Sequence, residues 1–351
     1  IIGGHSVNGV AKLHTELLKE DTLRDFYKIS PEKFNNKTNG IVQRRWTQIA
    51  APHLSQTIDK WIGDGWRSDI HELRKLNDFV DNPDAQADFW QVKQESKQRL
   101  ADYIEKTTGV HVNSQAIFDV QVKRLHAYKR QLLNVLHIIK LYWDIKDNPN
   151  ADFTPRVFIF GAKAAPGYHF AKSVIKVINE LANLINNDPA IGDKLKVVFL
   201  ENYRVSLAEL IIPAANVSEQ ISLASKEASG TSNMKFMMTG AVTLATLDGA
   251  NIEIKQEVGD DNIVIFGMDK DAVYRRYESH DYYSRGIYES NPVIHRVVNS
   301  LVDGTIPNCQ SEGNEIFDAL ITYNDEYFLL EDFQSYVELH SCMQIALGGC
   351  I

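Results

Sequence analysis

Apolar residues make up 44% of this 351-residue chain and charged residues 24%, a balance that is ordinary for a protein folded around a core. The net charge of −9 argues against a general nucleic-acid or anionic-membrane surface, and no apolar run approaches the roughly 18 residues that cross a bilayer. The three cysteines lack CxxC spacing and the histidines lack metal-ligand spacing, so we expect free thiols, a cytoplasmic location and no metal site.

The first third of the chain differs in pattern from the remainder. It begins Ile1-Ile2-Gly3-Gly4, which predicts a strand entered in the middle of a longer protein. Residues 55–76 and 84–106 are charged and look helical. We therefore expect residues 1–115 to hold an opening strand and a helical subregion.

Residues 116–351 alternate between short apolar runs and longer amphipathic stretches. The runs that suit buried parallel strands lie at residues 156–160, 195–200, 241–246 and 262–266, and the stretches of helix length include residues 127–144 and 168–186. Strand, helix and strand in repetition predict an α/β fold with a doubly wound, mostly parallel, Rossmann-like sheet. Because no repeat or flexible linker interrupts the pattern, it favours one continuous domain over residues 1–351.

The run from Glu227 to Phe236 (EASGTSNMKF) is the most informative stretch. Small and hydroxylated residues lead into a helix-compatible segment in which Lys235 has apolar neighbours. Backbone N–H groups at such a helix start can hold a phosphate, and Lys235, four residues after Thr231, lies over the same face. A phosphate cradle beside a partly desolvated lysine suits pyridoxal phosphate, which attaches covalently to an amine. Taken alone, the run fits an ordinary capped helix with a snorkelling lysine better.

Positive charge is concentrated between Lys123 and Arg130, in a chain that is acidic overall. Lys123 and Arg124 end an expected strand, while Lys129 and Arg130 open the following helix, so both pairs can face one crevice. Arginine binds phosphate through two parallel hydrogen bonds and lysine supplies a mobile charge, which indicates an anion site. The alternative is a solvated basic helix start, although such a start opposes the helix dipole.

Six ordered stretches of the chain resemble the α-glucan phosphorylases, the family of glycogen, starch and maltodextrin phosphorylases. The run around Lys235 continues into residues 246–253 (TLDGANIE) as the cofactor-lysine motif of that family does. The other matching stretches are residues 4–11 (GHSVNGVA), 36–41 (NKTNGI) with 44–46 (RRW), 119–126 (DVQVKRLH) with 128–130 (YKR), 161–169 (GAKAAPGYH) and 201–208 (ENYRVSLA). The resemblance is visible from about Ile2 to about Val337, and this many ordered matches make chance improbable.

The resemblance implies the C-terminal half of a two-domain glycosyltransferase of the GT-B type. Members of the family are much longer, so their N-terminal half and last helices would be missing here, and the tail at residues 344–351 does not resemble the family's continuation. In the family, the N-terminal half closes over the crevice and carries the usual dimer surface. We therefore expect this chain alone to hold cofactor yet turn over weakly or not at all, and any homo-oligomer to use other surfaces.

The resemblance also assigns roles to individual residues. Lys235 would carry pyridoxal 5′-phosphate, and Arg124 and Lys129 would hold the substrate phosphate, which makes these three the expected catalytic residues. The other expected cofactor contacts are Trp46, Lys123, Tyr203, Arg204, Val205, Gly230, Thr231 and Ser232, the last in place of the glycine of many relatives. The expected substrate contacts are Val10, Asn39, Tyr128, Glu227, Ala228, Ser229 and Gly230.

In the resembled family, the 5′-phosphate of the cofactor rather than its ring takes part in catalysis. A phosphate monoester has a second pKa of about 6, so near neutral pH it can both give and accept a proton. Beside inorganic phosphate it would assist the phosphorolysis of an α-1,4-glucan to α-glucose 1-phosphate, without the carboxylate pair of glycoside hydrolysis. The implied partners are inorganic phosphate, the glucan and glucose 1-phosphate, with no nucleic acid and no membrane.

Several alternatives stay open at this point. Taken singly, Asn39, Trp46 and Tyr203 fit turn or packing roles better than functional ones. A nucleotide-sugar glycosyltransferase of the same architecture would need no lysine-bound cofactor. An aminotransferase-like enzyme would bind amino acids at the cofactor, and a non-catalytic fragment would bind cofactor or glucan only.

Overall fold

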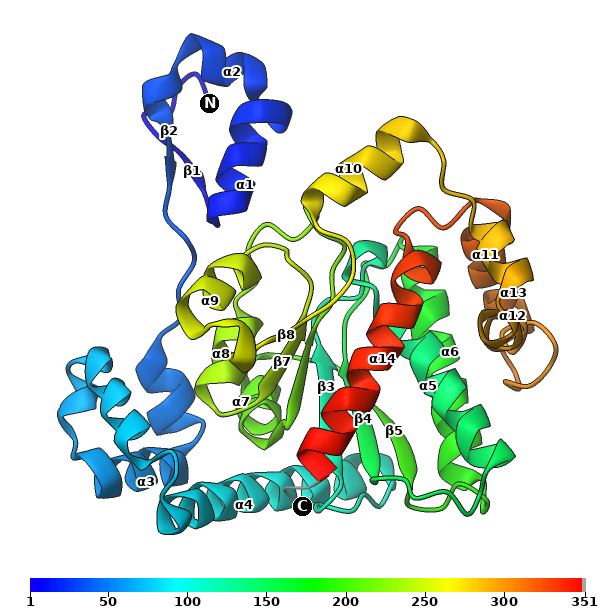
Figure 1. Cartoon of the computed structure of the whole chain (residues 1–351), viewed down its shortest axis with the longest axis horizontal. Helices are drawn as coiled ribbons and strands as arrows, with labels where there is room; N and C mark the ends of the chain where they lie inside the picture. The colour runs from blue at the N-terminus through cyan, green and yellow to red at the C-terminus, as the bar shows by residue number, and fades with distance from the viewer. Residues whose placement is uncertain (349–351) are drawn as a thin grey trace.

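The computed structural model describes the backbone of residues 1–348 and the side chains of residues 1–343 (Figure 1). A six-stranded parallel sheet forms its centre, in the strand order β5-β4-β3-β6-β7-β8. Its strands are β3 (Ile117–Val122), β4 (Arg156–Gly161), β5 (Leu195–Leu200), β6 (Val217–Gln220), β7 (Val242–Ala245) and β8 (Val264–Ile265). The order reverses between β3 and β6, which confirms the expected doubly wound, Rossmann-like α/β sheet. The expectation for the tail at residues 344–351 concerns its sequence, and the side chains of these residues lie outside the described part.

Helices cover both faces of this sheet, which explains why every residue of β3 and β4 is buried. Along β4, Phe158 and Phe160 pack into one apolar cluster, whereas Val157 and Ile159 pack into the cluster on the other face. The first cluster is covered by α5 (Gln131–Asp147), α6 (His169–Asn187) and α14 (Leu329–Gly348), and the second by α4 (Pro83–Thr108) and α7 (Val205–Ala214).

The helix α4 runs beneath the sheet, and the sequence marks both of its ends (Figure 1). Asn82 caps the first turn by accepting hydrogen bonds from two backbone N–H groups, and Pro83 occupies the first helical position. Gly109 ends the helix at φ +73°, a conformation that favours glycine. The prediction of a helix over residues 84–106 is confirmed.

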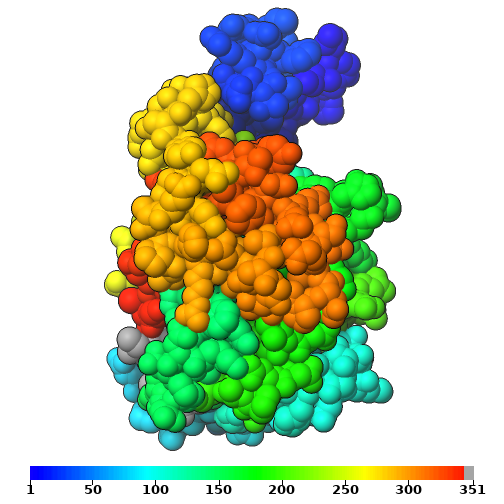
Figure 2. Space-filling view, turned by 90° about the vertical axis from the view of Figure 1, so that its right-hand side faces the viewer, coloured from blue at the N-terminus to red at the C-terminus, as the bar shows by residue number. Residues whose placement is uncertain are grey.

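The N-terminal segment stands apart from the sheet, as Figure 2 shows in blue above the rest of the molecule. It pairs β1 (Val7–Gly9) with β2 (Phe34–Asn36) and adds α1 (Lys12–Leu17) and α2 (Arg24–Ile29). The expected strand at Ile1–Gly4 is wrong, because pairing begins only at Val7. Glu253 of α9 (Asn251–Val258) ties this segment to the sheet region by accepting hydrogen bonds from Lys12 N and Thr38 Oγ1.

The remaining helices connect these parts. The predicted helix over residues 55–76 is confirmed only in its first half, since α3 (Pro52–Ile62) ends at Gly63 and short 3₁₀ turns follow. The other α-helices are α8 (Ser232–Met238), α9 (Asn251–Val258), α10 (Lys270–Ser279), α11 (Ser284–Ser290), α12 (Pro292–Asn299) and α13 (Gln310–Phe317). The short 3₁₀ or π segments are η1 (Leu18–Thr22), η2 (Pro31–Lys33), η3 (Arg45–Ile49), η4 (Gly65–Arg67), η5 (Ile70–Phe79), η6 (Ala127–Lys129), η7 (Asp260–Asn262) and η8 (Asp318–Thr322). Among the described residues, no helix combines the length and apolar character that crossing a membrane requires.

The outer edge of the sheet at β5 is closed by a side chain rather than by another strand. Asn186 of α6 donates from Nδ2 to Val197 O at 2.7 Å, and its Oδ1 accepts from Val197 N at 3.0 Å. The amide side chain thus makes the pair of hydrogen bonds that a neighbouring strand would make.

Candidate functional site

A cavity of about 280 Å³ lies at the carboxyl ends of β3 and β6, where the strand order reverses. Ligands of doubly wound sheets bind at such a reversal. The expected site residues that line the cavity are Lys123, Lys129, Tyr203, Glu227, Ser229, Gly230, Thr231, Ser232 and Lys235. Three separate segments of the chain, residues 123–129, Tyr203 and residues 227–235, therefore meet there.

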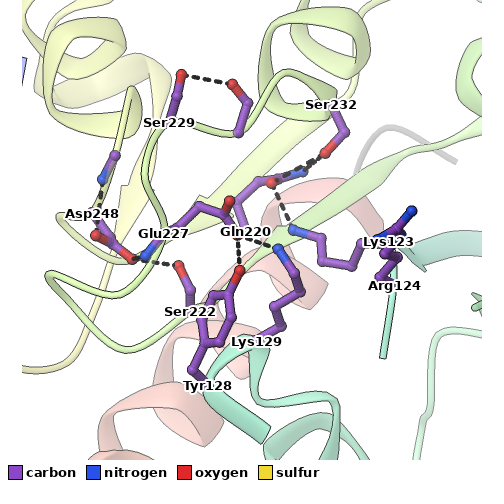
Figure 3. A network of polar contacts seen from close by, with 12 residues as sticks. Lys123, Arg124, Tyr128, Lys129, Gln220, Ser222, Glu227, Ser229, Ser232 and Asp248 are labelled. Carbon is purple, nitrogen blue, oxygen red and sulfur yellow. Dashed lines mark hydrogen bonds and ion pairs between the residues drawn. The ribbon is translucent and has the colours of Figure 1, made fainter. Parts of the chain in front are cut away.

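Lys123 follows the last residue of β3 and is held at the cavity by a chain of polar contacts (Figure 3). Its Nζ donates a hydrogen bond of 2.8 Å to Oε1 of Gln220, the last residue of β6. Nε2 of Gln220 donates to Ser218 Oγ at 2.9 Å and to Ser232 Oγ at 3.2 Å. Burial, together with the charge of Lys129, lowers the pKa of Lys123 to about 8. Lys123 is thus a fixed cation at neutral pH, and its hydrogen-bond partner is a neutral amide.

Lys235 lies in α8, which begins at Ser232 and has only seven residues. Its side chain is half-buried, with Nζ 4.4 Å from the ring centre of Trp46. Burial, with the nearby charge of Arg45, lowers the pKa of the Lys235 amine. More of the neutral, nucleophilic amine is then present at a given pH than for an ordinary lysine. Because a helix this short has few aligned peptide dipoles, the lysines supply most of the positive charge at the cavity.

Lys129 and Tyr128 both contact the carboxylate of Glu227. Lys129 Nζ forms an ion pair with Glu227 Oε2, and the hydroxyl of Tyr128 donates to the same oxygen at 3.3 Å. Burial lowers the pKa of Lys129, but the carboxylate of Glu227 outweighs this effect and raises the pKa above its ordinary value. Lys129 is therefore a charged cation at neutral pH, paired with Glu227.

Asp248 shapes the loop between β6 and α8, a role that the sequence motifs did not indicate. It is 1% exposed. Its carboxylate accepts hydrogen bonds from three groups of the loop, namely Ser222 Oγ (2.7 Å), Ser225 N (2.9 Å) and Glu227 N (2.9 Å). The next residue, Gly249, has φ +52°, and a Cβ there would lie 2.5 Å from Ser229 O. Asp248 and Gly249 together fix the path of the loop that carries Glu227 and Ser229.

Two arginines of the basic segment do not lie at the cavity as expected. Arg130 is fully buried, where Nε donates to Ile221 O at 2.8 Å and Nη1 to Asp332 of α14 at 2.7 Å. Its backbone turns at φ +57°, so α5 begins at Gln131 and the expectation that Arg130 faces the crevice is wrong. Arg124 is exposed and is not among the residues that line the cavity.

The remaining expected residues lie around the cavity rather than in its wall. Trp46 packs against Lys235, and Ala228 belongs to the loop between Glu227 and Ser229. Arg204 and Val205 cap and begin α7, and Val205 is 53% exposed.

Val10 and Asn39 lie in the N-terminal segment, where Asn39 N donates to Val10 O at 2.9 Å. That segment lies near the loop of Glu227: burial lowers the pKa of His14 in α1, and the charge of Glu227 opposes this shift. The N-terminal segment therefore borders the site on the side of Glu227.

Three potential metal ligands meet elsewhere, in the core behind the sheet. Asp119, Glu219 and His340 are buried, with ligand atoms within 4.8 Å of one another. Arg156 already provides a cation there, since its Nη1 lies 2.8 Å from His340 Nδ1 and 3.6 Å from Asp119 Oδ2. We therefore keep the expectation of no metal site as a prediction, and we treat this group as a charge cluster of the core.

The parallel sheet with its strand reversal places the protein among the doubly wound α/β proteins, in which ligand sites lie at that reversal. A family model described as carbohydrate phosphorylase matches residues 1–346. Glycogen phosphorylase of Bacillus subtilis is 52% identical over 344 residues, which cover 98% of this chain and 43% of that protein. Glycogen phosphorylase of Synechocystis is 49% identical, and the human muscle form 47% identical, each over 96% of this chain and 40% of its own length. The chain belongs to the carbohydrate phosphorylase family and spans about two fifths of the length of these relatives.

Proposed function

We propose that this chain forms the cofactor and phosphate side of an α-1,4-glucan phosphorylase site, with pyridoxal 5′-phosphate attached to Lys235. The observation that carries the proposal is the meeting of Lys235, a half-buried lysine of lowered pKa, with the fixed cation Lys123 in one cavity of about 280 Å³. A phosphate-bearing aldehyde requires both groups, a nucleophilic amine for the aldehyde and a cation for the phosphate. The proposal agrees with the names of the relatives, which are glycogen phosphorylases.

The fit of the cofactor depends on residues of three segments. The Lys235 amine would form the covalent attachment, and Trp46, against which Lys235 packs, would exclude water from one side. Lys123, oriented by Gln220, would hold the cofactor phosphate, with Ser232 completing the hydrogen-bond chain. When bound, the cofactor supplies a phosphate monoester that can give and accept a proton near neutral pH.

The substrate side of the proposal uses the polar group around Glu227. Lys129 would turn from Glu227 toward inorganic phosphate, because a dianion attracts an ammonium more strongly than a monoanion does. Glu227 would then accept hydrogen bonds from sugar hydroxyls, with Tyr128 beside it. Arg124 is exposed but directly follows Lys123 in the chain. Its long side chain would reach the phosphate by a change of rotamer.

The chain spans about two fifths of its relatives, so turnover is a separate proposal from cofactor binding. Water reaching the two phosphates would weaken their attraction to the lysines severalfold. We propose that this chain binds pyridoxal phosphate and catalyses phosphorolysis weakly or not at all. Turnover equal to that of a full-length relative would contradict the second part.

The first test is chemical labelling of the lysine. We expect borohydride reduction after incubation with pyridoxal phosphate to leave a stable pyridoxyl adduct on Lys235, located by peptide mass spectrometry. The Lys235→Ala variant should lose the adduct, whereas Lys226→Ala, which removes a neighbouring lysine outside the cavity, should keep it. An adduct spread over surface lysines, or none, would refute the proposed cofactor site.

A second test uses the pKa of Lys123. Since that pKa is about 8 in the free site, raising the pH above 8 removes the positive charge and weakens the hold on a phosphate. Pyridoxal lacks the phosphate, so the ratio of its Kd to the Kd of pyridoxal phosphate isolates this interaction from attachment at Lys235. We expect this ratio to fall above pH 8, by about 10- to 100-fold in total. A change of that size corresponds to the free energy that a hydrogen bond to a charged group contributes.

The control for this titration is Lys123→Gln, which has no charge to lose. Its ratio should be low at pH 7 and should not change as the pH rises. A wild-type ratio that stays constant between pH 7 and pH 10 would mean that another group holds the phosphate.

A further inference from the structure

Lys93 of α4 reaches the ends of two other helices through one ammonium group. Its Nζ donates hydrogen bonds to three backbone carbonyl oxygens, those of Pro213 (2.9 Å), Ala215 (2.8 Å) and Thr239 (2.9 Å). Three such contacts need all three N–H donors of a lysine ammonium, the form present below the pKa of Lys93, which burial and the charge of Lys97 lower to about 7. In the described part of the chain, Lys93 has no carboxylate partner that would offer another reason for its position.

The three carbonyls end the two helices that frame the cavity. Pro213 and Ala215 lie in the last turn and at the cap of α7, and Thr239 is the cap of α8. Carbonyl ends of helices carry partial negative charge, which a cation stabilises. The opposite ends of the same helices lie at the cavity, because α7 follows Tyr203 and α8 begins at Ser232.

Thr239 connects this contact to the cofactor lysine. Oγ1 of Thr239 lies 3.2 Å from the carbonyl oxygen of Lys235 and 3.2 Å from that of Ile212, so its single proton can be donated to α8 or to α7. With seven residues, α8 has fewer than two full turns at 3.6 residues per turn. A displacement of its carboxyl end therefore reaches Lys235 within one turn.

We infer that Lys93 is a positioning residue, which sets the place of Lys235 in the cavity by holding the carboxyl ends of α7 and α8 against α4. Lys93 itself does not line the cavity, so it would act only through these two helices. The link to the cofactor rests on the proposed function, whereas the link between Lys93 and the two helices rests on the three contacts alone.

Lys97 provides a matched comparison on the same helix. It lies one turn further along α4 and is fully buried, but its Nζ has no hydrogen-bond partner among the described residues and lies 5.1 Å from the ring centre of Phe118. Replacing Lys97 removes a buried ammonium from α4 without removing a hydrogen bond to α7 or α8. A general loss of stability in α4 would thus affect both lysine variants. A loss of the contact that positions α7 and α8 would affect only the Lys93 variant.

The experiment compares Lys93→Met, Lys97→Met and Lys93→Arg in the full chain. The measurements are the Kd of pyridoxal phosphate, the absorption maximum of the bound cofactor at saturation, and backbone hydrogen exchange over residues 235–242. We expect Lys93→Met to weaken binding by about 10- to 100-fold, since small misplacements of a reactive group have effects of this size. It should also shift the absorption maximum and speed exchange, whereas Lys97→Met should do neither. Lys93→Arg, which keeps the charge and several donors, should restore the absorption maximum.

Wild-type affinity, absorption and exchange in a folded Lys93→Met protein would overturn the inference, as would equal effects of the Lys93 and Lys97 substitutions. Should Lys93→Met fail to fold, Lys93→Gln, which keeps two donors, is expected to show the same changes at smaller size. If the unmodified chain gives no adduct on Lys235, the proposed function fails. Hydrogen exchange then still decides whether Lys93 holds the carboxyl ends of α7 and α8.

Discussion

Replacing Asp248 by asparagine is expected to weaken pyridoxal phosphate binding at least about tenfold, because the loop between β6 and α8 would lose its anchor. Burial raises the pKa of Asp248 to about 6, so the charged carboxylate accepts the loop's hydrogen bonds at neutral pH. Oδ1 accepts hydrogen bonds from Ser225 N and Gly249 N, while Oδ2 accepts hydrogen bonds from Ser222 Oγ and Glu227 N. An amide has one acceptor oxygen, so its NH₂ group would face two donors.

The same change is expected to lower the free energy of unfolding by about 3 kcal/mol, given about 1–3 kcal/mol for each buried donor left without a partner. Urea unfolding and a pyridoxal phosphate titration measure the two effects. Asp261→Asn, on an exposed turn, is the control and should change neither quantity noticeably. Unchanged affinity in Asp248→Asn would show that the loop keeps its shape without this carboxylate.

A still larger effect on stability is expected from Arg130→Met. The guanidinium of Arg130 and the carboxylate of Asp332 are both buried, and their contact joins the start of α5 to α14. Removing one partner leaves the other charge buried and uncompensated, which costs about 3–5 kcal/mol. We expect the urea midpoint to fall accordingly, with the greatest increase in hydrogen exchange in α14.

A double-mutant cycle separates this ion pair from packing. Asp332→Asn keeps an acceptor for Met268 N, which donates to Asp332 Oδ1 at 3.1 Å. The double variant Arg130→Met with Asp332→Asn should therefore lose less stability than the two single losses added together. Additive losses would show that the two side chains contribute independently.

The doubly wound sheet was predictable from the sequence because most of its strands are short runs of β-branched and aromatic residues, whereas the position of the reversal was not predicted. Residues 156–160 and 195–200 are β-branched or aromatic, and the structure places strands at nearly the same bounds. β6 escaped prediction because its sequence, VSEQ, is polar although all four residues are buried. Glu219 and Gln220 are buried there with partners from distant segments, such as Tyr336 and Lys123, and a local pattern does not contain them.

The candidate site was predictable in its charged members and not in the residues that orient them. Lys123 and Lys235 stand in motifs and meet at one cavity. Gln220 and Asp248 act through hydrogen bonds to residues from other segments, so only the fold reveals them. Arg130 was wrongly predicted to face the cavity, because its position was inferred from the local cluster of positive charge. Its left-handed backbone at φ +57° and its ion pair with Asp332 of α14 are not visible in the local sequence.

Asn186 has a consequence for how the molecule behaves among other molecules. The outer edge of a sheet offers unpaired N–H and C=O groups to any extended chain, and this is a common route to aggregation. By bonding both backbone groups of Val197, Asn186 blocks the middle of β5 with a side chain that belongs to the same molecule. In a concentrated solution, the backbone N–H and C=O groups at the centre of β5 are therefore not available to pair with a strand of another molecule.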